Sequence, residues 1–249
     1  MTPQQEAALK AIHEELLALL RDAVRVLDEE KLPYSLICGT LLGAVRHAGF
    51  IPWDDDIDIV LPRASYERFA EVYPSRAGEG FTLDLTDTWV PRVRKAGGRK
   101  TAFLDLFILD PLPTGKCARL LKLIRLKALQ GMLKEHTDYS RFSLAQRLLL
   151  RATDLIGKPL TKAAKLRAYA EIARQGAGEA VHMANGAFHL LGMPWVAKDF
   201  EMENLTPIPF EGLSVLVPKN ADELLTKLYG PDYMTPPPED QRVPLHLDL

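Results

Sequence analysis

Four aspartates fall within a stretch of five residues, and apolar residues lie on both sides of that stretch. The segment reads Phe50-Ile51-Pro52-Trp53-Asp54-Asp55-Asp56-Ile57-Asp58-Ile59-Val60-Leu61. The usual fate of such a charge run is a solvated acidic turn. The apolar flanks instead favour a strand, and alternation in strand period puts Asp54, Asp56 and Asp58 on one face. Carboxylates held this close repel each other unless a cation compensates, so the segment predicts a site for a hard divalent ion, most simply Mg²⁺.

A fifth aspartate, Asp105, lies inside the apolar run 102–109. An unpaired charge buried there would cost several kcal/mol or would take up a proton. A cation shared with Asp56 and Asp58 on a neighbouring strand would remove that cost. A structural aspartate with its own hydrogen-bond donors is the alternative interpretation.

A glycine-hydroxyl motif, Gly39-Thr40-Leu41-Leu42-Gly43, follows the strand expected at 34–38. A strand that runs through glycine into a helix exposes backbone N–H groups that suit phosphate oxygens. Alone, such a motif is usually only a turn. Here an Asp-x-Asp pair follows within 20 residues, and phosphate beside a carboxylate-bound metal is what phosphoryl transfer needs.

Hydrophobic periodicity predicts an α/β (α+β) chain, because strands and helices are interleaved. Helices are expected at 3–30, 63–73, 117–176 (with breaks near Ser143 and Pro159) and 221–229. Strands are expected at 34–38, 57–61, 81–85, 89–94, 101–109 and 213–217. We expect one domain over residues 1–249, with a basic helical subregion at about 116–176.

Composition excludes several classes of protein. With 47% hydrophobic and 26% charged residues the chain is globular rather than disordered or fibrous. No apolar run reaches the roughly 18 to 20 residues that cross a bilayer, and the first residues lack a secretory signal. Two cysteines build neither a disulfide framework nor a zinc site. We therefore expect a cytoplasmic protein.

The block from Gly39 to Ile59 closely resembles the signature of the LicD family, which includes bacterial phosphocholine transferases and the fukutin-related transferases of animals. The resemblance continues at Pro62-Arg63, Tyr66, 104–110, 210–212, 217–218, 228–230 and 233–234. It is weakest over 117–190, the region that would choose the acceptor. It implies a polymerase-β-like nucleotidyltransferase fold with a mixed central sheet and a helical insertion.

The resemblance also assigns roles to residues of this chain. It implies that Asp56, Asp58 and Asp105 bind Mg²⁺, with Mn²⁺ as the alternative ion, and that Asp54 is a further acidic catalytic residue. Either Asp54 or Asp105 would take the proton of the acceptor; the alternative is that both are only metal ligands. The substrate-binding residues would be Gly39, Thr40, Gly43, Arg46, Arg92 and Lys95. Arg92, Arg94 and Lys95 lie on the strand before Asp105, and Arg92 best matches the basic position of the family; a solvated strand charge is the alternative for each.

The activity implied is transfer of a phospho-alcohol, such as phosphocholine or a phospho-alditol, from a CDP-linked donor to a hydroxyl of a glycan or lipid-linked glycan. The alternative is a true nucleotidyltransferase that attaches an NMP to an acceptor. These reactions release CMP and pyrophosphate respectively. A third possibility is a binding protein that has kept the fold of the enzyme but lost its activity. Such a protein would have lost its catalytic carboxylates, and here all are present.

Positive charge is concentrated in one region. Residues 116–174 contain 14 Lys and Arg against four Asp and Glu. The simplest interpretation is a set of amphipathic helices with solvated charged faces. A second is peripheral contact with an anionic membrane, where a lipid-linked acceptor would lie. Nucleic acid is not expected, because no reader module is recognisable.

Overall fold

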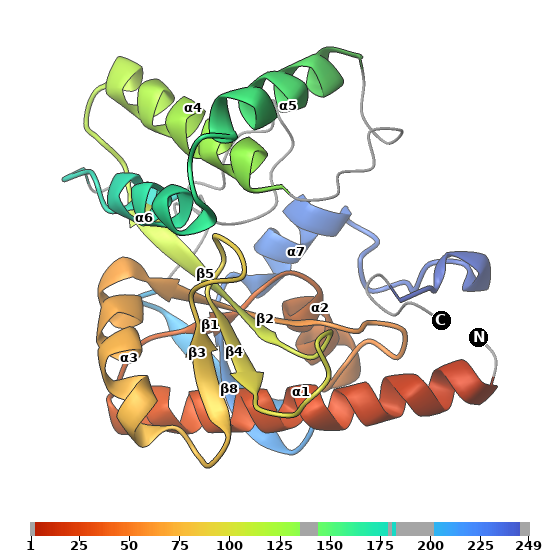
Figure 1. Ribbon diagram of the computed structural model, residues 1–249. Helices are drawn as coiled ribbons and strands as arrows, with labels where there is room; N and C mark the ends of the chain where they lie inside the picture. The colour runs from red at the N-terminus through yellow and green to blue at the C-terminus, as the bar shows by residue number, and fades with distance from the viewer. Residues whose placement is uncertain (1–2, 135–143, 179–180, 183–201, 245–249) are drawn as a thin grey trace. The chain divides into compact units, whose positions relative to one another are not determined.

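The computed structural model of the chain describes residues 3–134, 144–178, 181–182 and 202–244 (Figure 1). Internal contacts divide the chain into two units, which are treated separately below. The first comprises residues 1–84, 92–107 and 199–249, and the second comprises 85–91 and 108–198. The expectation of a single domain over the whole chain stays a prediction.

The first unit is built on a sheet in the order β1-β2-β5-β4-β3. Its strands are β1 (Ser35–Leu36), β2 (Ile57–Pro62), β3 (Phe81–Asp84), β4 (Arg92–Lys95) and β5 (Leu104–Pro111), of which the last continues into the second unit. β1 is antiparallel to β2, and β4 is antiparallel to both β3 and β5. The predicted mixed α/β architecture with a central sheet is confirmed, while the nucleotidyltransferase type of fold stays a prediction at this level.

Helix α1 (Pro3–Glu29) lies along the sheet and against α3 (Arg63–Arg76) (Figure 1). Its apolar residues recur at helical spacing, which is why one face is fully buried. That face consists of Leu9, Ile12, Leu16, Leu19, Leu20, Ala23, Val26 and Leu27. The first unit thereby has a hydrophobic layer beneath the strands that carry the aspartates.

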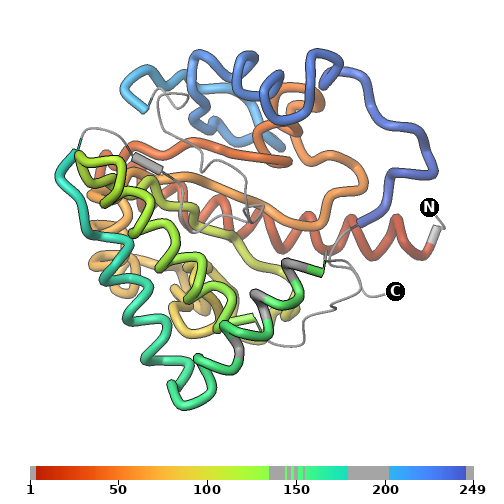
Figure 2. Tube along the Cα trace, turned by 90° about the horizontal axis from the view of Figure 1, so that it is seen from above, coloured from red at the N-terminus to blue at the C-terminus, as the bar shows by residue number. Residues whose placement is uncertain are grey.

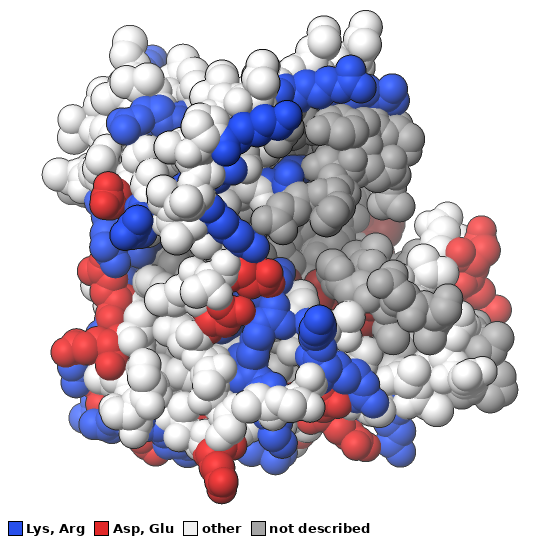
Figure 3. All heavy atoms as spheres, in the orientation of Figure 1, with Lys and Arg blue, Asp and Glu red and all other residues white. Residues whose placement is uncertain are grey.

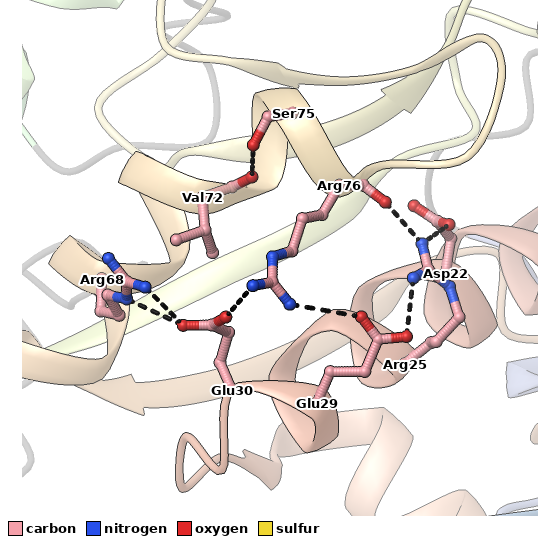
Figure 4. Close-up of polar contacts among 8 residues, drawn as sticks. All are labelled: Asp22, Arg25, Glu29, Glu30, Arg68, Val72, Ser75 and Arg76. Carbon is pink, nitrogen blue, oxygen red and sulfur yellow. Dashed lines mark hydrogen bonds and ion pairs between the residues drawn. The ribbon is translucent and has the colours of Figure 1, made fainter.

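Polar contacts hold the end of α1 to α3 (Figure 4). Glu30 accepts from Arg68 and Arg76, each at 2.8 Å. Asp22 is buried and accepts from the Tyr73 hydroxyl at 2.7 Å and from the Gly78 N–H at 3.0 Å. A buried carboxylate needs such hydrogen-bond donors. This network therefore fixes the position of α3 relative to the end of α1.

Helix α2 (Cys38–His47) follows β1 directly, and α7 (Ala221–Tyr229) lies beside it (Figure 2). A hairpin of β7 (Leu205–Phe210) and β8 (Leu213–Pro218) precedes α7, and β8 contacts β1. A 3-10 turn, η3 (Glu239–Gln241), lies in the C-terminal segment. Residues distant in sequence are thus brought next to the glycine-hydroxyl motif.

The second unit is formed mainly by α4 (Lys116–Leu133), α5 (Leu144–Gly157) and α6 (Lys162–Ala173). Its core contains Leu126, Leu129, Tyr169, Ile172 and Ala173. The short β6 (Val181–His182) pairs with the end of β5. The breaks predicted in this helical region fall between these helices, although residues 135–143 lie outside the described residues.

Lys122 is buried in the second unit and holds two of its helices together. Its Nζ donates to the carbonyl oxygens of Pro111, Ala173 and Gln175, at 2.5 to 2.8 Å. Two of these carbonyls lie at the C-terminal end of α6, where backbone oxygens have no partner within the helix.

In the part of the chain that the structure describes, no helix has the length and apolarity to cross a membrane.

Candidate active site

The glycine-hydroxyl motif and the aspartate run meet at one point of the first unit. The backbone N–H of Asp58 donates to Oγ1 of Thr40 at 2.8 Å, and the N–H of Ile37 donates to the Asp58 carbonyl at 3.3 Å. Thr40 and Asp58 are both buried. These bonds fix the start of α2 against the start of β2, as the spacing of the two motifs predicts.

The side chain of Asp58 is the electrostatic centre of this region. Burial raises the pKa of Asp58 well above its ordinary value, and the charges of Asp56, Asp105 and Asp54 raise it further. Arg92 opposes them with a smaller effect. Three of the carboxylates that the sequence singled out therefore lie close enough to act on the fourth, Asp58.

The strand predicted at 57–61 is confirmed as β2, but the expected alternation of the aspartates is wrong. Asp54 and Asp56 precede the strand instead of sharing its face with Asp58. The reason is a turn in which the Asp54 N–H donates to the Ile51 carbonyl at 2.9 Å. The Asp54 carbonyl in turn lies 2.7 Å from Nε2 of His13 in α1. The carboxylates are brought together by this turn and not by strand alternation.

Two glycines of the motif have different surroundings. A Cβ atom built on Gly39 would lie 2.5 Å from Oδ2 of Asp54, so the Asp54 carboxylate lies directly against the first turn of α2. A Cβ atom on Gly43 would lie 2.5 Å from the carbonyl oxygen of Gly49. Gly39 therefore faces the carboxylates, whereas Gly43 allows α2 to pack against the loop that leads to them.

Asp105 has a charged partner on the adjacent strand. Arg92 lies directly opposite Asp105 in the pairing of β4 with β5, and its Nε donates to Oδ1 at 2.7 Å. The Arg92 guanidinium also lies over the ring of Phe103, 3.8 Å from its centroid. The hydrogen bond from Arg92 satisfies one carboxylate oxygen of Asp105. A hydrogen-bonded structural aspartate was the alternative interpretation of this residue.

The other basic residues of β4 face different partners. Arg94 pairs with Asp84 at 3.2 Å, and Lys95 is exposed, with its Nζ 5.7 Å from the centre of the Phe81 ring. Of the two residues on this strand predicted to bind substrate, Arg92 lies at the carboxylates through its contact with Asp105, and Lys95 contacts a ring at the end of β3.

The carboxylates suit a hard divalent cation in chemistry but are not arranged as a formed site. Oxygen ligands with excess negative charge are what Mg²⁺ prefers. Yet among the residues that the structure describes, no group of three or more His, Cys, Asp or Glu side chains could hold a metal ion as it stands. A shared site for Asp56, Asp58 and Asp105 would therefore require these side chains to move.

Sequence reasoning missed two residues next to the aspartates, Cys38 and Tyr229. Burial raises the pKa of the Cys38 thiol, and Asp58, Asp56 and Asp54 add to the effect. Partial desolvation also raises the pKa of Tyr229, at the end of α7, with contributions from Cys38 and the same aspartates, although 46% of the residue stays exposed. The match of 228–230 to the family was the signal that could have identified Tyr229.

A second cationic side chain, Arg242, joins Arg46 at the ring of Trp53. The guanidinium carbons lie 5.9 Å (Arg46) and 5.1 Å (Arg242) from the ring centre, and Arg46 donates to the Tyr233 carbonyl at 2.8 Å. Burial lowers the pKa of Arg46, and Arg242 lowers it further. Nothing in the local sequence around Arg242 points to this position.

His47 also contacts this group. Its ring meets Trp53 edge-on at 6.3 Å between centroids. Burial lowers the pKa of His47, and the charge of Arg46 lowers it further. Two guanidinium groups gathered at one ring form a region that favours an anion.

The sequence of the chain is similar to sequences of known proteins. Residues 31–101 match the family model described as LicD/FKTN/FKRP, nucleotidyltransferase domain. The chain is 28% identical to the lipopolysaccharide cholinephosphotransferase LicD of Haemophilus influenzae, over 88% of this chain and 89% of that protein. It is 37% identical to an uncharacterized protein of Rickettsia prowazekii, over 38% of this chain and 33% of that protein. The resemblance to the LicD family is therefore confirmed, and the family model spans the motif, the aspartate run and β4.

Proposed function

We propose that this chain, which carries a LicD-type nucleotidyltransferase domain, is a Mg²⁺-dependent phosphotransferase. It moves a phospho-alcohol, of the phosphocholine or phospho-alditol type, from a CDP-linked donor to a hydroxyl of a glycan. The observation that carries the proposal is the group of carboxylates around Asp58, fixed to the start of α2 through Thr40. The name of the full-length relative, a cholinephosphotransferase, supports the class of reaction.

In this proposal Asp56 and Asp58 hold the cation, with Asp105 as the third ligand. A bound Mg²⁺ would neutralise charge on the diphosphate of the donor. Because burial and like charges raise the pKa of Asp58, a nearby cation would favour its ionised form. The Arg92 guanidinium keeps Asp105 oriented on β5 through the 2.7 Å contact.

Donor groups for the phosphates come from two parts of the first unit. The N–H groups at Gly39 and Thr40 lie at the N-terminus of α2, where backbone donors have no partner within the helix. Arg46 and Arg242 add positive charge beside Trp53. Asp54, against Gly39, is placed to take the proton of an acceptor hydroxyl, and Asp105 is the alternative base.

A nucleotidyltransferase is the second candidate, favoured by the description of the matching family model. The two reactions differ in the phosphorus atom that is attacked. Attack on the phosphorus that bears the alcohol breaks its bond to the bridging oxygen and releases CMP. Attack on the nucleoside phosphorus of an NTP releases pyrophosphate.

The test is product analysis with the purified chain, a panel of CDP-alcohols and lipopolysaccharide as the first acceptor. The proposal expects CMP release that EDTA abolishes and Mg²⁺ restores. Pyrophosphate release from NTPs, with no CMP from any CDP-alcohol, would establish the second candidate instead. The cytoplasmic location expected from the sequence stays a prediction, and neither outcome bears on it.

A further inference from the structure

Helix α4 is apolar on two opposite faces. One face packs into the core of the second unit through Leu126 and Leu129. The opposite face exposes Leu120, Leu121 and Ile124, whose side chains are 56 to 60% accessible to solvent. At 100° per residue these three form one stripe, turned away from the core. A soluble helix normally has one apolar face, which packs on the core, so a second, exposed apolar face indicates a binding surface.

Helix α5 repeats the pattern. Leu144, Leu148 and Leu155 are 59 to 75% accessible and recur at the spacing that places residues on one helical face. Arg151 is exposed on the same face. The two helices are in direct contact, since a Cβ atom on Gly131 of α4 would lie 2.5 Å from Oγ1 of Thr153 in α5. The exposed stripes thus belong to neighbouring helices of one unit.

The charge along α4 has one sign. α4 contains five basic residues and no Asp or Glu over its 18 residues: Lys116, Arg119, Lys122, Arg125 and Lys127. Burial and the nearby Lys134 lower the pKa of Lys127 to about 8. Blue side chains lie among white ones over the helices of this unit (Figure 3). Such crowding of cations beside exposed leucines complements an anionic surface that also offers an apolar layer.

The position of each basic residue separates structural from surface roles. Lys122 is buried and is used within the unit, and Arg119 donates to the Pro113 carbonyl at 2.7 Å. Arg125 is exposed, and on the helical wheel it lies on one side of the leucine stripe, with Lys127 on the other. Exposed leucines between two cationic borders are the pattern of helices that lie in a membrane interface.

We propose that α4 and α5 dock the second unit on the surface of an anionic lipid bilayer. Leu120, Leu121 and Ile124 would enter the boundary between head groups and acyl chains, and Arg125 and Lys127 would contact lipid phosphates. A protein partner with an acidic rim around an apolar groove would satisfy the same chemistry. The bilayer is favoured because basic residues border the exposed leucines of α4 on both sides, which complements lipid phosphates above an apolar layer. This inference goes beyond the proposed function and does not depend on it.

The test is co-sedimentation of the full chain with vesicles of phosphatidylcholine alone or of phosphatidylcholine mixed with phosphatidylglycerol. The proposal expects binding only to the anionic vesicles, decreasing as salt rises because the lipid phosphates are screened. No binding, or equal binding to both vesicle types, would overturn it.

Single substitutions identify the surface. Ile124→Glu and Leu148→Glu should each weaken binding to anionic vesicles by about tenfold, because a carboxylate replaces a buried apolar side chain near lipid phosphates. Leu85→Glu is the matched control, since Leu85 is 49% exposed and lies outside both helices. Circular dichroism checks that all variants are folded. Equal losses in all three variants, or none, would contradict the assignment of this surface.

Self-association is the competing explanation for the exposed leucines, and sedimentation velocity of the lipid-free chain tests it. The proposal expects the same sedimentation coefficient for the wild type and Ile124→Glu. A wild-type dimer that Ile124→Glu converts to a monomer would assign the stripe to a second copy of the chain and overturn the proposal.

Discussion

Substitution of Gly39 by alanine tests whether the start of α2 and the aspartate run act as one site. The new Cβ atom would lie 2.5 Å from Oδ2 of Asp54, whereas ordinary contacts begin at 3.4 Å. The carboxylate must therefore withdraw by about 0.9 Å. A misplacement of about 1 Å in a catalytic group can cost on the order of 100-fold in rate, and we expect a loss of that size in kcat/KM.

The same substitution should leave the fold intact. Alanine in place of glycine within a helix gains roughly 0.5–1 kcal/mol, and the atom it meets is the end of a side chain that can rotate. We expect the free energy of unfolding in urea to change by less than about 1 kcal/mol. Activity is measured as CMP release from the CDP-alcohol that the panel identifies.

Gly43→Ala is the matched control, four residues further along the same helix. Its Cβ atom would lie 2.5 Å from the backbone carbonyl oxygen of Gly49, which cannot rotate away. We expect it to lower the free energy of unfolding by about 1–3 kcal/mol. If Gly39→Ala acts through Asp54, it should cause no further loss of activity in an Asp54→Ala background. Full activity of Gly39→Ala, or losses that add in the double variant, would refute the reasoning.

Three further predictions concern the charged residues. The pKa of Asp58 is raised in the folded state, so the folded chain holds that proton more tightly than the unfolded chain, and stability falls as pH rises above the ordinary aspartate value of 3.8. In EDTA, Asp58→Asn should remove this decline in urea unfolding between acid and neutral pH and should abolish turnover; an unchanged pH dependence would contradict the burial of its charge. Arg92→Lys should lower stability by about 1–2 kcal/mol, because it loses the Asp105 contact and stacking on a ring, and should lower kcat/KM. Arg94→Lys is the control and should leave kcat/KM unchanged. Equal losses of kcat/KM in the two variants would show that the contact of Arg92 with Asp105 has only a structural role. Arg242→Gln should raise KM for the nucleotide donor about tenfold with little change in kcat; an unchanged KM would remove Arg242 from the donor site.

The local parts of the site could be predicted from the sequence. The spacing of the glycine-hydroxyl motif and Asp58 placed both at neighbouring elements, and the apolar run around Asp105 placed it in a buried strand. The structure has both features. These predictions succeed because each depends on burial and periodicity over a few residues.

The geometry of the aspartate run could not be predicted in the same way. Alternation suggested that Asp54, Asp56 and Asp58 share one strand face, but a turn closed by the Ile51 carbonyl leaves Asp54 and Asp56 ahead of the strand, which begins at Ile57 as predicted. The pairing of Arg92 with Asp105 depends on the register between β4 and β5, which two short strands do not specify by themselves.

Two other features depend on contacts distant in sequence. Arg242 reaches Trp53 only because the C-terminal segment returns to α2, as the bond from Arg46 to the Tyr233 carbonyl indicates. Strand β7 was not predicted because it contains Pro207 and Pro209, which lack an N–H donor. These prolines are two residues apart and share one edge of the strand, so the other edge can pair with β8.

Equilibrium binding of Mn²⁺ to the wild type and to Asp56→Asn, with and without the CDP-alcohol donor, tests the central claim most directly. The proposed function predicts saturable binding that Mg²⁺ displaces, and a loss of affinity in the variant of more than about tenfold, since a charged oxygen ligand is removed. The variant should lose turnover in parallel. Equal Mn²⁺ affinity in both proteins, together with CMP release that continues in EDTA, would contradict the assignment of these aspartates to a divalent cation.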